Sequence, residues 1–210
     1  GLVAVLALAD VDVAAAVAPV DGNHEACGVS IGKQLKSACQ EAKGGRLLLM
    51  FGACHIPANN DLVKGALSVL GEDLSVVGGA AFNDRTYAAG KPVEKSNVGL
   101  LISGDFECGF GINKDNSPKG LIASAKETFE QAVGDAGEKV ALMLVFDCGG
   151  RRGKMQGNGN FAEELAAMKS VVGDTPIFGF YGSGEMGRKS CDTPSFGDGY
   201  HISATALIPQ

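Results

Sequence analysis

The residues best suited to chemistry follow an apolar run in the second half of the chain. Residues 142–146 are all apolar, and they lead into the segment Asp147–Lys154, which contains three glycines and the pair Arg151 and Arg152. An arginine fork can bind a carboxylate through two hydrogen bonds, and glycines let backbone amides approach an anion. Since open α/β sheets place ligands at the carboxyl ends of their strands, this segment predicts an anion-binding site. A solvated basic loop is the alternative interpretation.

A second polar segment, Gly179–Glu185, follows another apolar run. It would deliver the carboxylate of Glu185 and several backbone amides to one place. If Arg151 binds a carboxylate while Glu185 binds an ammonium group, the pair suits an amino acid. Tyr181 would complete the ligand shell. A serine nucleophile at Ser183 is not predicted, because the G-x-S-x-G turn is absent.

The first half of the chain offers corresponding residues at Cys54, Asn83 and Asp84. Cys54 and Cys148 occupy matching positions, so they are interpreted either as a thiol pair across the two halves or as two structural thiols. A reactive cysteine needs an accessible, electropositive setting, and the adjacent arginines give only Cys148 a sign of one. A cysteine-dependent enzyme that uses Cys148 therefore stays open as an alternative from another functional class.

The three histidines, His24, His55 and His201, show no metal-binding spacing, so a zinc site is not predicted. Haem needs only one axial imidazole, which leaves a haem-binding gas sensor open, with His55 or His201 as its ligand. Apart from that alternative, no cofactor is expected.

The two halves of the chain repeat one pattern. In each half an apolar run leads to a cysteine, then to a helical stretch, then to a second apolar run and an acid, at offsets of 94 (148 − 54) and 101 (185 − 84) residues. This self-similarity predicts an α/β protein of two tandem pseudo-repeated half-domains, 1–104 and 105–210, with mixed sheets covered by helices. The two final strands of each half could pair as antiparallel neighbours. One continuous sheet and two facing sheets both fit the periodicity.

Apolar periodicity and turn residues locate the individual elements. Strands are predicted at 11–17, 46–51, 74–77, 98–102, 106–112, 140–146, 177–181 and 201–208. Helices are predicted over 32–42, over about 61–70 with Asn59 or Asn60 as the N-cap, after Ser117-Pro118, and after Asn160.

Composition narrows the functional classes. Hydrophobic residues make up 45% and charged residues 20%, which is typical of a globular protein. A net charge of −6 without a basic stripe argues against a nucleic-acid partner. No apolar run reaches the roughly 18–20 residues that span a bilayer, so membrane insertion is not predicted. The six cysteines include no C-x-x-C pair, so reduced thiols and a cytoplasmic location are expected.

The second half of the chain resembles the C-terminal FIST domain. The resemblance rests on an apolar strand leading into F-D-C-G-G-R at 146–151, on P-I-F-G-F-Y-G-S-G-E at 176–185, and on a terminal strand that begins at His201. The family pattern is roughly F-S-C-x-G-R followed by P-x-x-G-F-x-S-x-G-E, so the chain departs from it at Asp147 and Gly182. Residues that match the motif are Cys148, Gly150, Arg151, Gly179, Phe180, Gly184 and Glu185.

The first half resembles the N-terminal FIST domain more loosely, through residues 47–51 and 77–79. The resemblance implies a sensory module, often fused to signalling output domains, that binds small ligands such as amino acids; some similar proteins bind haem and sense nitric oxide. No enzymatic activity is established for the family. We therefore expect a non-enzymatic signal-transduction domain that binds an amino acid in the crevice between its repeats, with signalling domains or proteins as partners. The expected ligand-binding residues are Cys54, Asn83, Asp84, Cys148, Arg151, Tyr181 and Glu185.

Overall fold

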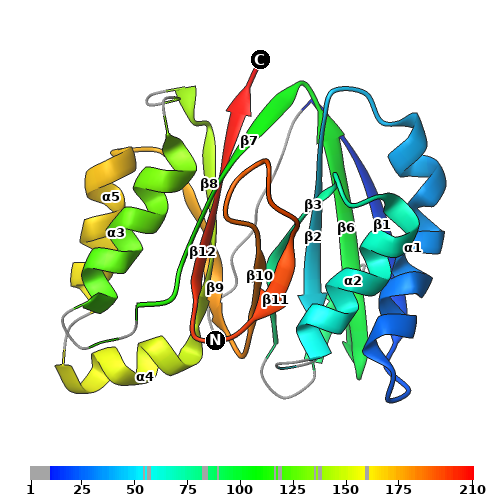
Figure 1. Ribbon diagram of the computed structural model, residues 1–210, viewed down its shortest axis with the longest axis horizontal. Helices are drawn as coiled ribbons and strands as arrows, with labels where there is room; N and C mark the ends of the chain where they lie inside the picture. The colour runs from blue at the N-terminus through cyan, green and yellow to red at the C-terminus, as the bar shows by residue number, and fades with distance from the viewer. Residues whose placement is uncertain are drawn as a thin grey trace.

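The computed structural model describes residues 10–53, 55, 58–81, 85–88, 90–115, 117, 120–134, 136, 139–158 and 161–210. Two sheets face each other across the middle of the molecule, as Figure 1 shows. In spatial order the six-stranded sheet contains β1 (Val11–Pro19), β6 (Ser96–Gly104), β2 (Gly45–Gly52), β3 (Ser75–Ala80), β10 (Glu185–Gly187) and β11 (Phe196–Asp198). The four-stranded sheet contains β7 (Phe106–Asn113), β12 (Ile202–Pro209), β8 (Leu142–Cys148) and β9 (Ile177–Gly182). A separate hairpin pairs β4 (Arg85–Ala88) with β5 (Lys91–Glu94).

The order β1-β6-β2-β3 in one sheet matches the order β7-β12-β8-β9 in the other. In both sheets the last two of these strands run parallel, and the remaining neighbours are antiparallel. The final strand of each half therefore lies between the first and second strands of that half. The expectation that the two final strands of each half pair with one another is wrong. The parallel pairs β2–β3 and β8–β9 need helical crossovers, and these bring both carboxyl ends to one edge of each sheet.

The six-stranded sheet is completed by residues from the second half of the chain. Strand β10 pairs with β3, so that Glu185 lies opposite Gly79. The fully buried Asn59 donates from its side chain to the backbone oxygens of Glu185 (3.2 Å) and Asp198 (2.7 Å). The acid of the second polar segment is therefore held by the first half of the chain.

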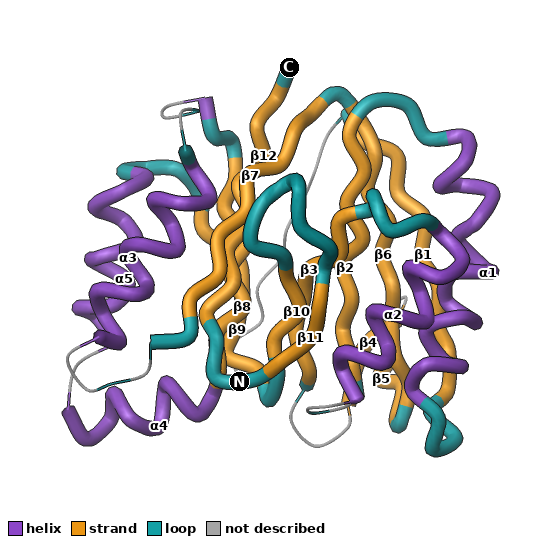
Figure 2. Tube along the Cα trace, viewed as in Figure 1, coloured by secondary structure: helices purple, strands orange, loops and turns teal. Residues whose placement is uncertain are grey.

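Helices cover the outer face of each sheet, which gives four layers (Figure 2). Helices α1 (His24–Glu41) and α2 (Ala58–Leu70) cover the six-stranded sheet, and α3 (Gly120–Val133) and α5 (Phe161–Val172) cover the four-stranded sheet. Helix α4 (Gly149–Asn158) follows β8 directly. The predicted class, α/β with mixed sheets covered by helices, is confirmed, and of the two open arrangements the chain adopts facing sheets.

An apolar cluster fills the space between the two sheets. It consists of Leu47, Leu49, Val77, Ile102, Phe106, Phe110, Leu142, Leu144, Phe146 and Leu207. Phe51 and Phe180 pack against this cluster, and the rings of Phe51, Phe146 and Phe180 have centroids 5.4–6.4 Å apart. Aromatic pairs at such distances add about 0.5–1.5 kcal/mol each beyond the burial of their area. The surface between the two halves is thus largely a packed core.

Three local predictions differ from the observed elements. Helix α1 begins at His24, eight residues before the predicted start at residue 32, because the Asn23 side chain caps it by accepting from Ala26 N at 2.9 Å. Helix α2 begins at Ala58, so the expected caps Asn59 and Asn60 lie inside it, where Asn59 binds strands of the sheet instead. The arginine segment, interpreted as a loop, is the helix α4.

Candidate functional site

The carboxyl end of β8 divides the predicted site between the two faces of the four-stranded sheet. Consecutive residues of a strand point to opposite faces, so the side chains of Asp147 and Cys148 point apart. Asp147 shares a cavity with residues of α5, whereas Cys148 lies beside Glu185 of β10, toward the other sheet. The expected ligand residues are therefore two separate groups of side chains.

Arg151 is completely buried, and each of its five N–H groups has a protein acceptor. The acceptors are Asp147 Oδ1 (2.8 Å), Asp115 O (2.7 Å), Ser124 Oγ (3.0 Å), Leu121 O (2.9 Å) and Glu164 Oε1 (3.3 Å). No donor is left for the carboxylate that this arginine was expected to bind. In this arrangement Arg151 positions Asp147 and Glu164.

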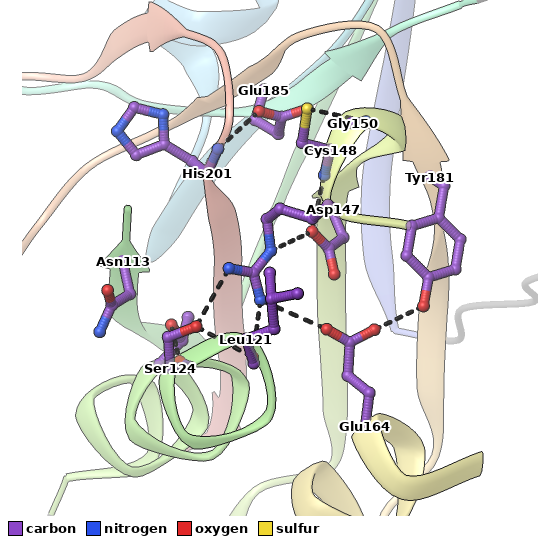
Figure 3. Close-up of polar contacts among 12 residues, drawn as sticks. Asn113, Leu121, Ser124, Asp147, Cys148, Gly150, Glu164, Tyr181, Glu185 and His201 are labelled. Atoms are coloured by element: carbon purple, nitrogen blue, oxygen red, sulfur yellow. Dashed lines mark hydrogen bonds and ion pairs between the residues drawn. The ribbon is translucent and has the colours of Figure 1, made fainter. Parts of the chain in front are cut away.

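A cavity of about 310 Å³ lies between α5 and the outer face of β8 and β9. Its polar end is formed by Asp147, Glu164 and Tyr181, which Figure 3 shows grouped together. The Tyr181 hydroxyl donates to Glu164 Oε2 at 2.5 Å. The remaining walls are Val145, Phe161, Leu165, Met168, Ile177, Gly179 and Phe180. Apolar walls with a few convergent polar groups are the usual make-up of a small-molecule site.

Asp147 presents a free acceptor at this polar end. Its Oδ1 atom accepts from Arg151 and from the Cys148 amide (2.7 Å), while Oδ2 is buried and has no donor within hydrogen-bonding distance. Burial raises the pKa of Asp147 well above its ordinary value, Arg151 opposes that rise, and the facing carboxylate of Glu164 adds to it. Two facing carboxylates can hydrogen-bond only if one carries a proton. Burial and the facing Glu164 carboxyl group thus favour the protonated form of Asp147, and a cationic ligand group could replace that proton.

Arg152 lies at the aromatic edge of the same cavity. Its guanidinium carbon is 5.2 Å from the ring centroid of Phe161 and 5.5 Å from that of Tyr181, and both rings line the cavity. Unlike its neighbour Arg151, Arg152 is exposed. Stacking on aromatic faces leaves the edge of a guanidinium available to a carboxylate.

The second group of side chains, Cys148, Glu185 and His201, lies where β8, β10 and β12 meet (Figure 3). All three are buried, and Glu185 Oε2 accepts from the His201 amide at 3.1 Å. Glu185 Oε1 and His201 Nδ1 are buried without a hydrogen-bond partner. Burial raises the pKa of Glu185 to about 8, and burial followed by the neighbouring Glu185 charge raises the pKa of Cys148. Cys148 is therefore a protonated, enclosed thiol near neutral pH.

The two candidate haem ligands lie in different surroundings. His201 is 6% exposed, its ring packs edge-on against Phe196 at 5.9 Å, and burial lowers its pKa. His55 is exposed.

Four of the seven expected ligand-binding residues lie among the residues that the structure describes. Tyr181 lines the cavity, Arg151 supports it from behind, and Cys148 and Glu185 lie at the meeting point of the sheets. Cys54, Asn83 and Asp84 lie outside the described residues. The sequence interpretation missed Glu164, whose side chain is buried. An acid in the first turn of a helix is common, because it stabilises the positive end of the helix dipole, so its position in α5 gave no sign of a site.

In the part of the chain that the structure describes, no group of three or more His, Cys, Asp or Glu residues could hold a metal ion. No helix in these ranges is long and apolar enough to cross a membrane.

Comparisons with known proteins agree with the resemblance in the sequence. Residues 1–130 match the FIST N domain, and residues 93–188 match the FIST C domain. No curated protein matches the sequence significantly. Among solved structures, cyanuric acid hydrolase from A. caulinodans is 12% identical, with a TM-score of 0.42, over 98% of this chain and 73% of that one. A second cyanuric acid hydrolase structure is also 12% identical, with a TM-score of 0.44, over 99% of this chain and 72% of that one.

Proposed function

Because the chain belongs to the FIST-domain family, a family of sensory and signal-transduction domains, we propose that it is a non-enzymatic sensor that binds an apolar amino acid in the cavity beneath α5. The single observation that carries this proposal is the buried, unpartnered Oδ2 atom of Asp147 at the polar end of an otherwise apolar cavity. An ammonium group supplies the donor that this atom lacks.

The polar end favours a cation over an anion. Asp147 and Glu164 together bring two carboxyl groups to one buried arginine, so the cluster is neutral with Asp147 protonated and negative without that proton. An ammonium group that replaces the proton keeps the cluster neutral and retains its hydrogen bonds. Since the proton must leave, binding of the ammonium group is expected to strengthen as pH rises.

The carboxylate of an amino acid needs a cation, and Arg152 supplies it. Its guanidinium stacks over Phe161 and Tyr181 at the edge of the cavity, where a ligand that reaches Asp147 with its ammonium group would place its carboxylate. The arginine segment thus keeps the role expected for it, through the second arginine and not the first. The apolar walls, Met168 and Ile177 among them, would receive the ligand side chain.

The volume limits the size of the ligand. At about 310 Å³ the cavity is at the small end of the range of roughly 300–1,000 Å³ seen for ligand pockets. Valine, leucine, isoleucine and methionine match this volume and the apolar walls better than charged amino acids do.

The test is a thermal-shift screen against the common amino acids at millimolar concentration, followed by calorimetry with the best ligand. A ligand at 100 times its dissociation constant stabilises the folded state by about 2.7 kcal/mol, which raises the melting temperature by several degrees. Arg152→Gln should weaken binding of that amino acid about tenfold but leave binding of its decarboxylated amine unchanged. Lys154→Gln is the matched control, because it removes the same charge from the same helix away from the cavity.

A flat amino-acid panel would overturn the proposal, and so would an Arg152→Gln variant that binds the amino acid as tightly as the unaltered protein. Haemin belongs in the same screen. A Soret band from a stoichiometric complex would favour the haem-sensor alternative instead.

A cysteine-dependent enzyme is a second candidate, favoured by one observation. Cys148 lies beside the buried carboxyl group of Glu185, which resembles a nucleophile next to a base. The raised pKa of the thiol argues against this role. The effect of Glu185 on the reactivity of Cys148 distinguishes a catalytic cysteine from a structural one, as discussed below.

A further inference from the structure

Two cysteines that play no part in the proposed ligand site lie against each other at the other end of the sheets. Cys108, in β7, points toward the six-stranded sheet together with Phe106 and Phe110, since all three pack in or against the cluster between the sheets. Cys191 lies in the segment that joins β10 to β11, and its Sγ atom is 3.4 Å from the carbonyl oxygen of Cys108. Both residues line a cavity of about 460 Å³. The contact therefore joins the two sheets at an accessible edge.

A buried arginine fixes this contact. The Arg188 guanidinium is held by Ser75 Oγ at 2.7 Å and lies over the Phe110 ring at 5.3 Å. From there it donates to the carbonyl oxygens of Ser190 (2.9 Å) and Cys191 (2.5 Å). Because Arg188 is 4% exposed and its other contacts are to both sheets, the backbone at Cys191 is held next to β7.

We propose that Cys108 and Cys191 form a redox-active thiol pair, which a low-molecular-weight disulfide oxidises to a disulfide that cross-links the two sheets. The Cys191 sulfur lies 3.4 Å from the backbone carbonyl of Cys108, so the two cysteines are direct neighbours, and rotation of their side chains is the movement that would bring the two sulfur atoms together. The two cysteines lie apart from the cavity beneath α5, so the test of this thiol pair is independent of the test of the proposed function.

The order of events follows from the difference in exposure. Cys191 is exposed, so its thiolate attacks the small disulfide R–S–S–R, forms Cys191–S–S–R and releases one R–S⁻. The Cys108 thiolate then attacks the Cys191 sulfur, forms the Cys108–Cys191 bond and releases the second R–S⁻. Two cysteine thiols are oxidised, one small disulfide is reduced to two thiols, and the two cysteine protons pass to the released thiolates.

The second step is the slow one. Burial raises the pKa of Cys108 to about 12, and the neighbouring Cys191 thiolate adds to that rise. Once Cys191 is in a mixed disulfide it carries no charge, so the first step removes one obstacle to the second. Proximity within one folded chain favours closure even though the Cys108 thiolate is scarce. Closure should therefore accelerate with pH, close to tenfold per unit, over the range in which Cys108 is mostly protonated.

The experiment treats the folded full chain with 2-hydroxyethyl disulfide, quenches the reaction with acid, and maps tryptic peptides by mass spectrometry. Trypsin releases Cys108 within residues 96–114 and Cys191 within residues 190–210, and neither peptide contains another cysteine. We expect these two peptides to appear cross-linked, with a loss of two hydrogens and no retained hydroxyethyl group.

Three variants separate the steps. Cys108→Ser should accumulate the mixed disulfide on Cys191, Cys191→Ser should leave Cys108 unmodified, and Cys148→Ser should still form the cross-link. Unaltered protein that stops at the mixed disulfide on Cys191 across pH 7–9, or that cross-links a different pair, overturns the proposal. Circular dichroism of each reduced variant establishes that it is folded before the reaction.

Discussion

Arg151 donates from Nε to Asp147 Oδ1 at 2.8 Å from one helical turn further along the chain, and the two side chains are 0% and 5% exposed. This pair ties the first turn of α4 to the end of β8. Helix α4 includes Gly149, Gly150 and Gly153, and each glycine costs a helix about 1 kcal/mol relative to alanine. The helix is therefore stabilised mainly by what Arg151 contacts, and its intrinsic propensity contributes little.

Replacement of Arg151 should destabilise the fold much more than replacement of Arg152. Arg151→Ala leaves two buried acids and two backbone carbonyls without their donor, so the free energy of unfolding should fall by about 3–5 kcal/mol. Arg152→Ala removes an exposed side chain and should change it by less than about 0.5 kcal/mol. Urea denaturation of both variants measures the difference. Equal effects would mean that Arg151 is not the anchor of α4.

The free energy of unfolding should fall as pH rises through neutrality, because of Glu185. Its pKa rises from 4.5 to about 8 on folding, chiefly through burial. Below about pH 4.5 the carboxyl group is protonated in both states, and between 4.5 and 8 only the folded state retains the proton. The contribution of Glu185 to the free energy of unfolding is therefore fully present below the unfolded-state pKa. It declines as pH rises toward the folded-state pKa, by at most about 1.4 kcal/mol per pH unit.

Glu185→Gln isolates this contribution, because the amide cannot ionise. The unfolding free energy of the variant should vary less between pH 5 and 8 than that of the unaltered protein. Glu72→Gln, at an exposed position in a turn, is the control and should keep the original slope. A Glu185→Gln profile that runs parallel to the original would contradict a proton held by Glu185.

Much of the fold could be predicted from sequence because its signals are local. Continuous apolar runs such as 142–146 mark strands buried on both faces. Helix α4 could not be predicted in this way, since its glycines and charges read as a loop. What makes it a helix is the set of acceptors around Arg151, which come from Asp147, from residues 27 to 36 positions earlier and from Glu164.

The sequence identified the two motifs but not the place of the cavity, which lies on the outer face of the four-stranded sheet, whereas the ligand was expected in the crevice between the repeats. The two motifs identified the ends of β8 and β9, but the difference between Asp147 and Cys148 depends on which face each strand turns to the helices. Burial also separates the two adjacent arginines, since Arg151 faces inward and Arg152 outward. Neither fact is encoded in the spacing of the motif.

Glu185 should slow the modification of Cys148, not promote it. The negative charge of Glu185 is the second cause of the raised Cys148 pKa, after burial. Glu185→Gln should therefore raise the thiolate fraction and speed alkylation of Cys148 by iodoacetamide above pH 8. If Glu185 were a catalytic base for this thiol, the same variant would react more slowly. The alkylation rate of Cys27, which is buried in another part of the protein, is the control, because it would rise if the variant loosened the fold as a whole.

The last prediction compares two glycines for which alanine should have opposite effects. At Gly179, in β9 on the wall of the ligand cavity, an added Cβ would lie 1.7 Å from the Val145 carbonyl oxygen of the neighbouring strand. Gly179→Ala must shift β9 away from β8, and should lower the free energy of unfolding by about 1–3 kcal/mol. At Gly153, an exposed position in α4, an added Cβ meets nothing within 4 Å.

Gly153→Ala should therefore stabilise the protein by about 0.5–1 kcal/mol, the gain in helix propensity. Thermal or urea denaturation measures both variants against the same reference. Because β9 forms one wall of the ligand cavity, Gly179→Ala should also weaken amino-acid binding, whereas Gly153→Ala should leave binding unchanged. If Gly153→Ala destabilised the protein, α4 would not be helical at that position, and the placement of Arg152 at the edge of the cavity would have to be reconsidered.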